Sequence, residues 1–203
     1  MVTSDPSIPV RAPFNAKGLV YVGARDFFSE RVTGGWEAVI ANLDPETATF
    51  FKQQFLSGGW YDVMPILPIS RAAARTAQSP WPRFVRQNAV WLAERDLRGI
   101  YKLVVSIASV ERIVQRLPEL SLRYFDFGDA AGKMVDERVF EADRYGIPEP
   151  LVEWFSIVTS GFVPVALGTA GAKNVRVRTL GHDPDGEAHG VALVRSRYHI
   201  TWD

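Results

Sequence analysis

The sequence predicts an α+β fold in which an N-terminal layer of helices packs on a C-terminal antiparallel sheet, with one long helix (about 149–170) before a terminal hairpin. Apolar residues at helical spacing dominate residues 25–117. From Val175 onward, apolar and polar residues alternate strictly. A sheet with one apolar face must bury that face, and the helices supply the cover.

The N-terminal end differs from the rest of the chain. Prolines interrupt residues 1–16, which show little periodicity, so we expect an extended arm there. The segment Lys17–Val22 suits either a short strand or the start of a helix. We expect residues 17–203 to form a single domain, because a chain of this length can bury about 70% of its surface around one core.

The region after the arm carries repeated helix signals. The strongest is Asp44-Pro45-Glu46, which places a capping carboxylate, a proline at the first helical position and a second acid beside the positive helix end. We expect that helix to reach Leu56 and to stop at Gly58-Gly59. The expected helices cover residues 25–32, 36–43, 44–56, 65–77, 80–98, 101–107 and 110–117.

After Pro118 the pattern changes. The aromatic segment Leu120–Phe127 predicts a strand, and Asp136–Tyr145 predicts a second one. The long helix follows, with Pro164 inside it as an expected kink. In the final segment, Asp183–Gly186 is a turn signal between two alternating strands, so we expect a hairpin with one buried face.

Composition excludes several functional classes. The chain has 203 residues with 23 basic and 23 acidic side chains, and this balance argues against broad capture of nucleic acid or anionic membrane. It has no cysteine, which excludes disulfides, thiolate metal sites and thiol nucleophiles. The N-terminal residues do not resemble a signal peptide, and Glu153, Gly161 and Pro164 interrupt the most apolar segment, so we expect a cytoplasmic protein without a membrane span.

Four arginines form the first candidate site. Arg176 and Arg178 share one face of one hairpin strand, and Arg195 and Arg197 share one face of the other. All four should project from the same side of the hairpin, away from its apolar face. Acids in residues 126–143 could neutralise them as cross-strand ion pairs, and the alternative is a patch that binds an anion or a protein partner.

Aromatic residues form the second candidate site. Most of them are expected to pack in the core, and the alternative is a cavity for an apolar ligand between helices and sheet. The candidate pocket residues are Trp60, Tyr61, Trp81, Trp91, Tyr101, Phe125, Trp154 and Phe155.

Catalytic and metal-binding signatures are missing from the sequence. The three histidines are His182, His189 and His199, and no nucleophile elbow, phosphate loop or established metal-ligand spacing accompanies them. His182 and His189 are expected to be solvated residues flanking a turn. We therefore expect no metal, no cofactor and no enzymatic activity, with a small hydrolase or isomerase that uses Asp126 or Tyr61 as the least favoured reading.

Four segments spread along the chain carry a family resemblance: Gly18-Leu19-Val20, Gly58–Asp62, Tyr124–Gly128 and Ile200-Thr201-Trp202. On these segments the chain resembles a superfamily of α+β ligand-binding domains that includes haem nitric-oxide-binding domains, vinyl-reductase-like domains and TRAPP-type trafficking subunits. More narrowly, it resembles an uncharacterised paralogous family of myxobacteria. The resemblance implies a pocket between helices and sheet, and self-association.

The resemblance also implies what the pocket would lack. The haem-binding members use a helical histidine as the proximal ligand, and this sequence has no histidine before His182, which argues against haem bound in that manner. Tyr61 or Tyr101 would be the alternative axial ligands. Some trafficking subunits carry an acyl group on a cysteine, so a pocket in this cysteine-free chain would be empty or would hold its ligand non-covalently.

Together these observations favour a non-enzymatic sensor or interaction module that binds a small apolar ligand, or none, without haem. The runner-up is a protein-protein interaction domain that uses the arginine face, either as a homodimer or with another partner.

Overall fold

The computed structural model describes residues 12–98 and 109–203, and it has the predicted α+β architecture. The N-terminal half consists of the elements β1 (Asn15–Lys17), α1 (Gly18–Arg31), α2 (Gly35–Ile40), α3 (Pro45–Phe50), β2 (Trp60–Asp62), α4 (Ile66–Thr76) and α5 (Trp81–Arg98). The C-terminal half consists of α7 (Val110–Leu122), β3 (Asp129–Asp136), β4 (Val139–Pro148), the 3-10 turn η1 (Glu149–Leu151), α8 (Val152–Thr169), β5 (Arg176–Ala188) and β6 (Val191–Thr201).

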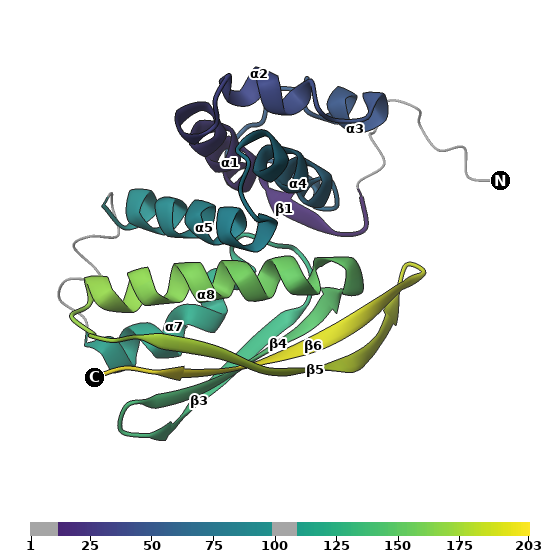
Figure 1. Cartoon of the computed structure of the whole chain (residues 1–203). Coiled ribbons are helices and arrows are strands. Elements are labelled where there is room, and N and C mark those ends of the chain that lie inside the picture. The colour runs from purple at the N-terminus through teal and green to yellow at the C-terminus, as the bar shows by residue number, and fades with distance from the viewer. Residues whose placement is uncertain (1–11, 99–108) are drawn as a thin grey trace.

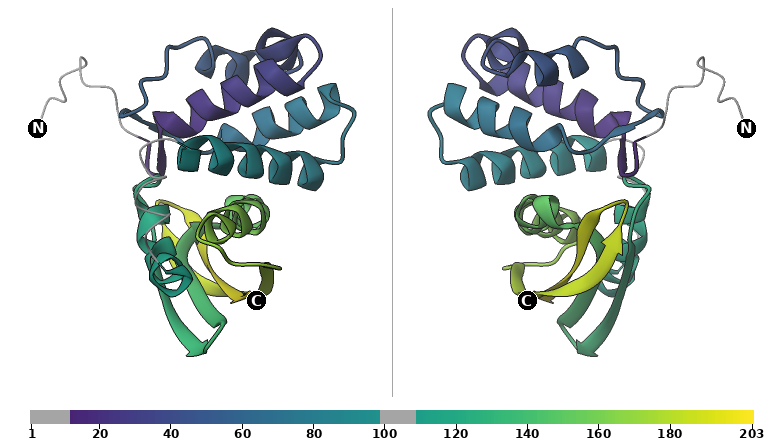
Figure 2. Two further views of the ribbon diagram at one scale, coloured as in Figure 1. Left: turned by 90° about the vertical axis from the view of Figure 1, so that its left-hand side faces the viewer. Right: turned by 90° about the vertical axis from the view of Figure 1, so that its right-hand side faces the viewer.

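The elements stack in layers. Helices α1 to α4 form an upper layer, α5 lies beneath it, α8 packs below α5, and the sheet lies below α8 (Figures 1 and 2). Helix α7 packs along β3 at one side of the sheet. The long helix and the terminal hairpin are therefore confirmed, and the helices cover one face of the sheet.

Among the described residues, the main sheet is four-stranded and antiparallel, with the order β3-β4-β6-β5. Its register pairs Phe140 with Ile200 and Ala142 with Tyr198, and both pairs face the helices. On the opposite face, Arg178 pairs with His199 and Asp183 pairs with Arg195. The alternation in the sequence thus decides which side of each strand is buried, as predicted.

The turn of the terminal hairpin lies later than predicted. Strand β5 continues through Asp183–Gly186, and the reversal occurs at His189-Gly190, both of which have positive φ. The register of β5 against β6 shifts between Thr179 and Gly181 and again between Pro184 and Glu187, and the strand therefore includes the proline and the glycine of the expected turn. His182 is therefore an exposed strand residue instead of a residue beside the turn, and its Nδ1 lies 2.9 Å from the hydroxyl of the buried Ser196.

The prediction of a strand over Leu120–Phe127 is wrong. Helix α7 continues past Pro118 and ends at Leu122, and Leu117 and Leu120 cover the interior between helices and sheet. Residues 123–127 form turns and bends, in which Phe125 forms an isolated bridge with Ala16 and Lys17 donates to the carbonyl of Tyr124, and the first strand of the main sheet begins only at Asp129. The predicted helix 101–107 lies outside the described residues.

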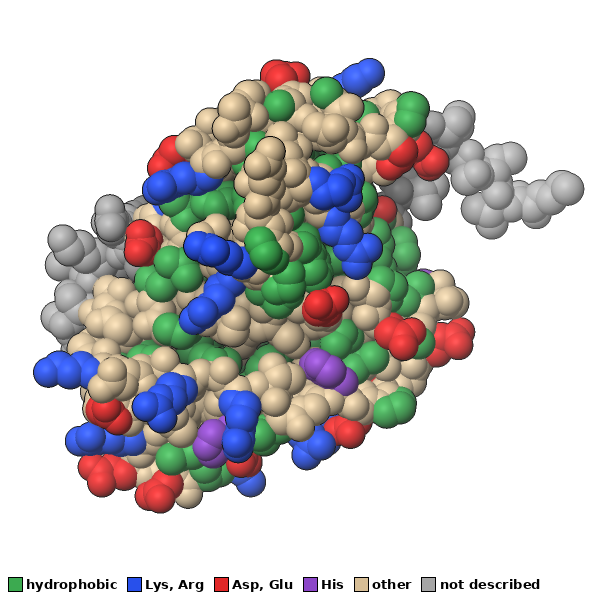
Figure 3. Space-filling view, in the orientation of Figure 1, with side chains coloured by type: hydrophobic (Ala, Val, Ile, Leu, Met, Phe, Trp, Pro, Cys, Tyr) green, Lys and Arg blue, Asp and Glu red, His purple; other side chains and the backbone are tan. Residues whose placement is uncertain are grey.

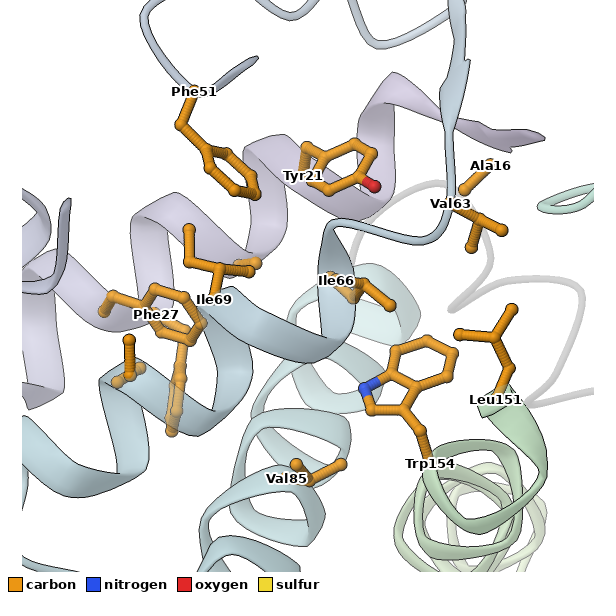
Figure 4. Close-up of a cluster of buried hydrophobic side chains, with 14 of the residues drawn as sticks. Ala16, Tyr21, Phe27, Phe51, Val63, Ile66, Ile69, Val85, Leu151 and Trp154 are labelled. Atoms are coloured by element: carbon orange, nitrogen blue, oxygen red, sulfur yellow. The ribbon is translucent and has the colours of Figure 1, made fainter. Parts of the chain in front are cut away.

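The N-terminal layer has an aromatic core. Helix α3 ends at Phe50 instead of Leu56, because Phe51 and Phe55 are buried and pack against Tyr21. The Tyr21 hydroxyl donates to the carbonyl of Asp62. Figure 4 shows the rings of Phe51 and Tyr21 beside each other within this core, with the Tyr21 hydroxyl on the side away from Phe51.

Residues 1–11 of the predicted arm lie outside the described part of the chain. Its last residues are packed, since Phe14 and Ala16 are buried and β1 pairs with β2.

The segment Glu149–Thr169 is long and apolar enough to cross a membrane by length and composition, although 39% of its most apolar window is buried inside the protein. This helix is sandwiched between α5 and the sheet (Figure 1), where core helices of soluble proteins also lie.

Candidate functional site: a cavity between the helices and the sheet

A cavity of about 190 Å³ lies where the N-terminal helices, α5, α7 and α8 meet the inner face of the sheet. Its walls are mainly apolar. The helical walls include Leu19, Val85, Leu92, Leu117 and Phe162, and Ala142 and Ile200 form part of the sheet wall. The predicted location of a pocket, between helices and sheet, therefore matches the geometry.

Three of the aromatic residues predicted for a pocket line this cavity: Phe125, Trp154 and Phe155. Trp154 projects from the start of α8 toward Ile66 of α4, so it joins the two helical layers (Figure 4). Phe155 packs edge-to-face against Phe125, with ring centroids 4.8 Å apart.

The other predicted pocket residues are elsewhere. Tyr61 packs in the N-terminal aromatic core, where its hydroxyl accepts a 2.8 Å hydrogen bond from the Leu56 amide, and Trp60 carries Lys17 over its ring. Trp81 donates to Ser70, and Trp91 donates to Glu30. These four belong to local packing and surface contacts, which residue type alone does not distinguish from a cavity wall. Tyr101 lies outside the described residues.

Arg144 is the main polar group of the cavity, and the sequence analysis missed it. Its side chain extends from the inner face of β4, and the residue is 5% exposed. One terminal nitrogen, Nη2, donates a 2.9 Å hydrogen bond to the carbonyl of Phe127, whereas Nε and Nη1 have no partner among the described residues. The rings of Phe127 and Phe155 lie 5.8 and 5.7 Å from the guanidinium carbon.

Burial makes this charge costly. Loss of water around the guanidinium lowers the pKa of Arg144 from 12.5 to about 10, a trend that Tyr198 and Asp129 partly oppose. Among the ion pairs between described residues, none involves Arg144. The two acidic residues among those that line the cavity each bind another arginine, Asp96 with Arg95 and, on the outer face of the sheet, Asp143 with Arg195.

Two further polar groups of the cavity have an atom without a partner. The buried hydroxyl of Tyr198 on β6 has no partner in residues 12–98 and 109–203. Tyr198 is a diagonal neighbour of Arg144 on the same face of the sheet, because Arg144 pairs with Ser196. The buried side-chain oxygen of Asn88 on α5 likewise has no partner in the described part of the chain. Unsatisfied buried polar atoms are rare in native proteins, and here three such groups share one cavity.

Local chain geometry positions Arg144. Gly128 and Gly146 both have positive φ and approach closely, and a Cβ on Gly128 would collide with the carbonyl oxygen of Tyr145. This contact brings the end of the Phe127 segment against β4, where its carbonyl receives the Arg144 hydrogen bond. The signal in the sequence was the alternation Phe140, Ala142, Arg144, which puts the arginine on the inward face of its strand.

The arginine face of the sheet lies opposite the cavity. Arg195 forms a 2.8 Å ion pair with Asp143, as expected for acids in residues 126–143, and Arg197 forms a 3.1 Å pair with Asp183. Arg176 and Arg178 are exposed, and no ion pair within the described residues involves them. Figure 3 shows basic and acidic side chains interspersed over the part of the surface where the sheet lies.

Neither the histidines nor Asp126 lie in the cavity wall. His199 approaches Glu141 at 3.7 Å on the outer face, and the His189 ring packs on Phe14. Asp126 accepts two hydrogen bonds from Asn15, at 2.7 and 2.9 Å, and thereby fastens β1. Within residues 12–98 and 109–203, no group of three or more histidines and acids is placed to hold a metal ion.

Comparison with known proteins gives a clear result for the fold. No protein-family model matches the sequence, and a comparison with curated proteins found no match. The fold is similar to that of a Cs H-NOX mutant carrying 4-cyano-L-phenylalanine, with a TM-score of 0.66 and 11% identity over 92% of this chain and 96% of that chain.

Two further solved structures support the same assignment. One is an oxygen-binding H-NOX domain related to soluble guanylate cyclases, as its oxygen complex, with a TM-score of 0.62 and 11% identity over 92% of each chain. The other is an H-NOX structure that bears on the molecular mechanism of H-NOX activation, with a TM-score of 0.61 and 11% identity over 92% of this chain and 94% of that chain. The chain therefore has the fold of the H-NOX domains.

Proposed function

We propose that this chain is a non-enzymatic, cytoplasmic ligand-binding sensor module that holds a small apolar ligand in the cavity between its helices and its sheet, and that it does so without haem. The observation that carries the proposal is the 190 Å³ cavity with mainly apolar walls, which occurs in a fold shared with oxygen-binding H-NOX domains. Apolar cavities with a few convergent polar groups are the usual form of small-molecule sites.

Three observations support a ligand other than haem. Protein ligands to haem iron are histidine, cysteine, methionine or tyrosine, and the described cavity wall contains none of these except Tyr124 and Tyr198. The three histidines of the sequence all follow residue 181, and none lines the cavity. The cavity is also smaller than the range of about 300–1,000 Å³ typical of drug-sized ligands.

A titration with haemin tests the absence of haem, and native mass spectrometry after mild extraction tests for a small ligand. We expect no Soret band above that of free haemin, and a bound or bindable apolar molecule of low mass. A stoichiometric Soret shift would overturn the first part of the proposal. Failure of any small apolar probe, such as 1-hexanol, to bind at millimolar concentration would overturn the second.

The arginine face supports a second candidate function, a protein-protein interaction module that forms a homodimer or binds another partner. The observation in its favour is that Arg176 and Arg178 are exposed without an ion pair in the described structure. Light scattering of the wild type and of Arg178→Glu tests this candidate. A dimeric wild type and a monomeric variant would support this candidate. Equal masses of the two proteins would exclude the arginine face as the dimer interface. We also propose that the chain belongs to the paralogous myxobacterial family that it resembles. Homologous sequences from myxobacteria that share Gly18-Leu19-Val20, Gly58–Asp62, Tyr124–Gly128 and Ile200-Thr201-Trp202 would support this membership.

A further inference from the structure

We infer that the cavity takes a small monocarboxylate, with its carboxylate on Arg144 and its apolar part against the helices. This inference rests on the proposed function, because it names the chemical class of the ligand for the same cavity.

Arg144 lacks a counter-ion among the described residues. A buried guanidinium is costly unless it is paired and hydrogen-bonded, and Arg144, a residue only 5% exposed, has one hydrogen bond. Asp129 offsets the effect of burial only in part, and Asp143 is bound to Arg195 on the outer face. A ligand carboxylate would supply both the charge and the acceptor atoms, since arginine binds carboxylates through parallel N–H bonds.

The position of the unpaired hydrogen-bond donors also favours an anionic ligand. Within the described ranges, Nε and Nη1 of Arg144 lack partners, and so does the hydroxyl of Tyr198 on the neighbouring strand. All belong to residues of the cavity wall, so an anion there could accept from both side chains. One buried positive charge matches one negative charge, which favours a monocarboxylate over a dianion such as a phosphate monoester.

The size and polarity of the cavity set limits on the rest of the ligand. An engineered apolar cavity of about 150 Å³ accommodates benzene, so 190 Å³ suits a ligand of about six to nine non-hydrogen atoms. Apart from the polar groups already named, side chains such as Leu92, Leu117 and Phe162 form the wall. Hexanoate, with eight non-hydrogen atoms, has the predicted size, one charge and an apolar tail.

Calorimetric titration of the full chain with hexanoate, 1-hexanol and hexylamine at pH 7 tests the inference. We expect hexanoate to bind at least tenfold more tightly than hexanol, and hexylamine to bind more weakly than both. In Arg144→Met, which keeps the length of the side chain without its charge, hexanoate should lose at least tenfold in affinity while hexanol changes less than threefold. The control Arg178→Met removes an exposed arginine and should bind all three ligands as the wild type does.

The outcomes separate this inference from the proposed function. Equal binding of hexanoate and hexanol to the wild type would refute the carboxylate site and leave an apolar ligand cavity. Binding of none of the three would overturn both. If Arg144→Met does not fold, carbon-13 NMR of carboxyl-labelled hexanoate bound to the wild type measures the pKa of the bound carboxylate and tests the inference without a variant. A bound carboxylate held by Arg144 stays ionised below the pKa of the free acid, and one that titrates like the free acid refutes the inference.

Discussion

Replacing Arg144 by methionine should leave the ligand-free protein about as stable as the wild type. Burial lowers the pKa of the guanidinium from 12.5 to about 10, which corresponds to a cost of about 3 kcal/mol for keeping the charge in the folded state. Methionine removes that cost and keeps an apolar side chain of similar length in contact with Phe127 and Phe155.

Opposing losses reduce this gain. The variant leaves the carbonyl of Phe127 without its 2.9 Å hydrogen bond, at a cost of about 1–3 kcal/mol, and it loses two cation–π contacts of about 0.5–1 kcal/mol each. The expected net change in the free energy of unfolding therefore lies between about −2 and +1 kcal/mol, where a negative value means a less stable variant.

Urea denaturation of both proteins, after extraction of any bound ligand, measures this difference. A loss of 3 kcal/mol or more is the usual result of breaking a buried, neutralised ion pair, and it would mean that Arg144 already has a counter-ion in the fold. The same measurement with hexanoate at a hundred times its dissociation constant should stabilise the wild type by about 2.7 kcal/mol. The variant should gain much less at that concentration.

The remaining predictions concern stability and the cavity volume. Burial raises the pKa of the Tyr21 hydroxyl well above 10, so the unfolded chain releases this proton at lower pH than the folded protein does. The free energy of unfolding should therefore fall as pH rises above about 10. Urea denaturation of Tyr21→Phe should show a weaker dependence on pH in that range. Gly161→Ala should destabilise the protein by about 1–3 kcal/mol, because its Cβ would lie 2.9 Å from Ala89 on α5. Gly168→Ala, in the same helix with open space around it, should stabilise by about 0.5–1 kcal/mol, and equal effects of the two would contradict this packing. Ala142→Leu should fill part of the cavity and weaken hexanol binding at least tenfold, whereas Ala131→Leu on exposed β3 should not; unchanged affinity in Ala142→Leu would place the ligand elsewhere.

Local signals in the sequence predicted the elements whose geometry is local. Asp44 caps α3 as expected, with its carboxylate accepting from the amide of Thr47 at 2.9 Å. The alternation after Val175 predicted the buried and exposed faces of the terminal hairpin, because side chains on a strand point to opposite sides in turn. The same rule predicted that four arginines share the outer face.

The predictions that failed concern segments whose structure depends on contacts with residues far away in the chain. The turn signal Asp183–Gly186 became part of a strand, because pairing with β6 extends to Ala188 and the bulged backbone tolerates its glycine and proline. Leu120 could belong to a strand or a helix by local preference, and its place in the cavity wall goes with the helix. Of the eight predicted pocket aromatics, the three that line the cavity follow α7 or lie at the start of α8.

By itself the sequence determined the fold class, the faces of the hairpin and the lack of cysteine chemistry, because these depend on residue type and on spacing along one element. The alternation in β4 turns Arg144 inward, but only the tertiary structure decided that it lies beside Tyr198 and the ring of Phe155 with no counter-ion among the described residues. The surroundings of that charge come from strands and helices far apart in the chain, and hence spacing along one strand could not reveal them.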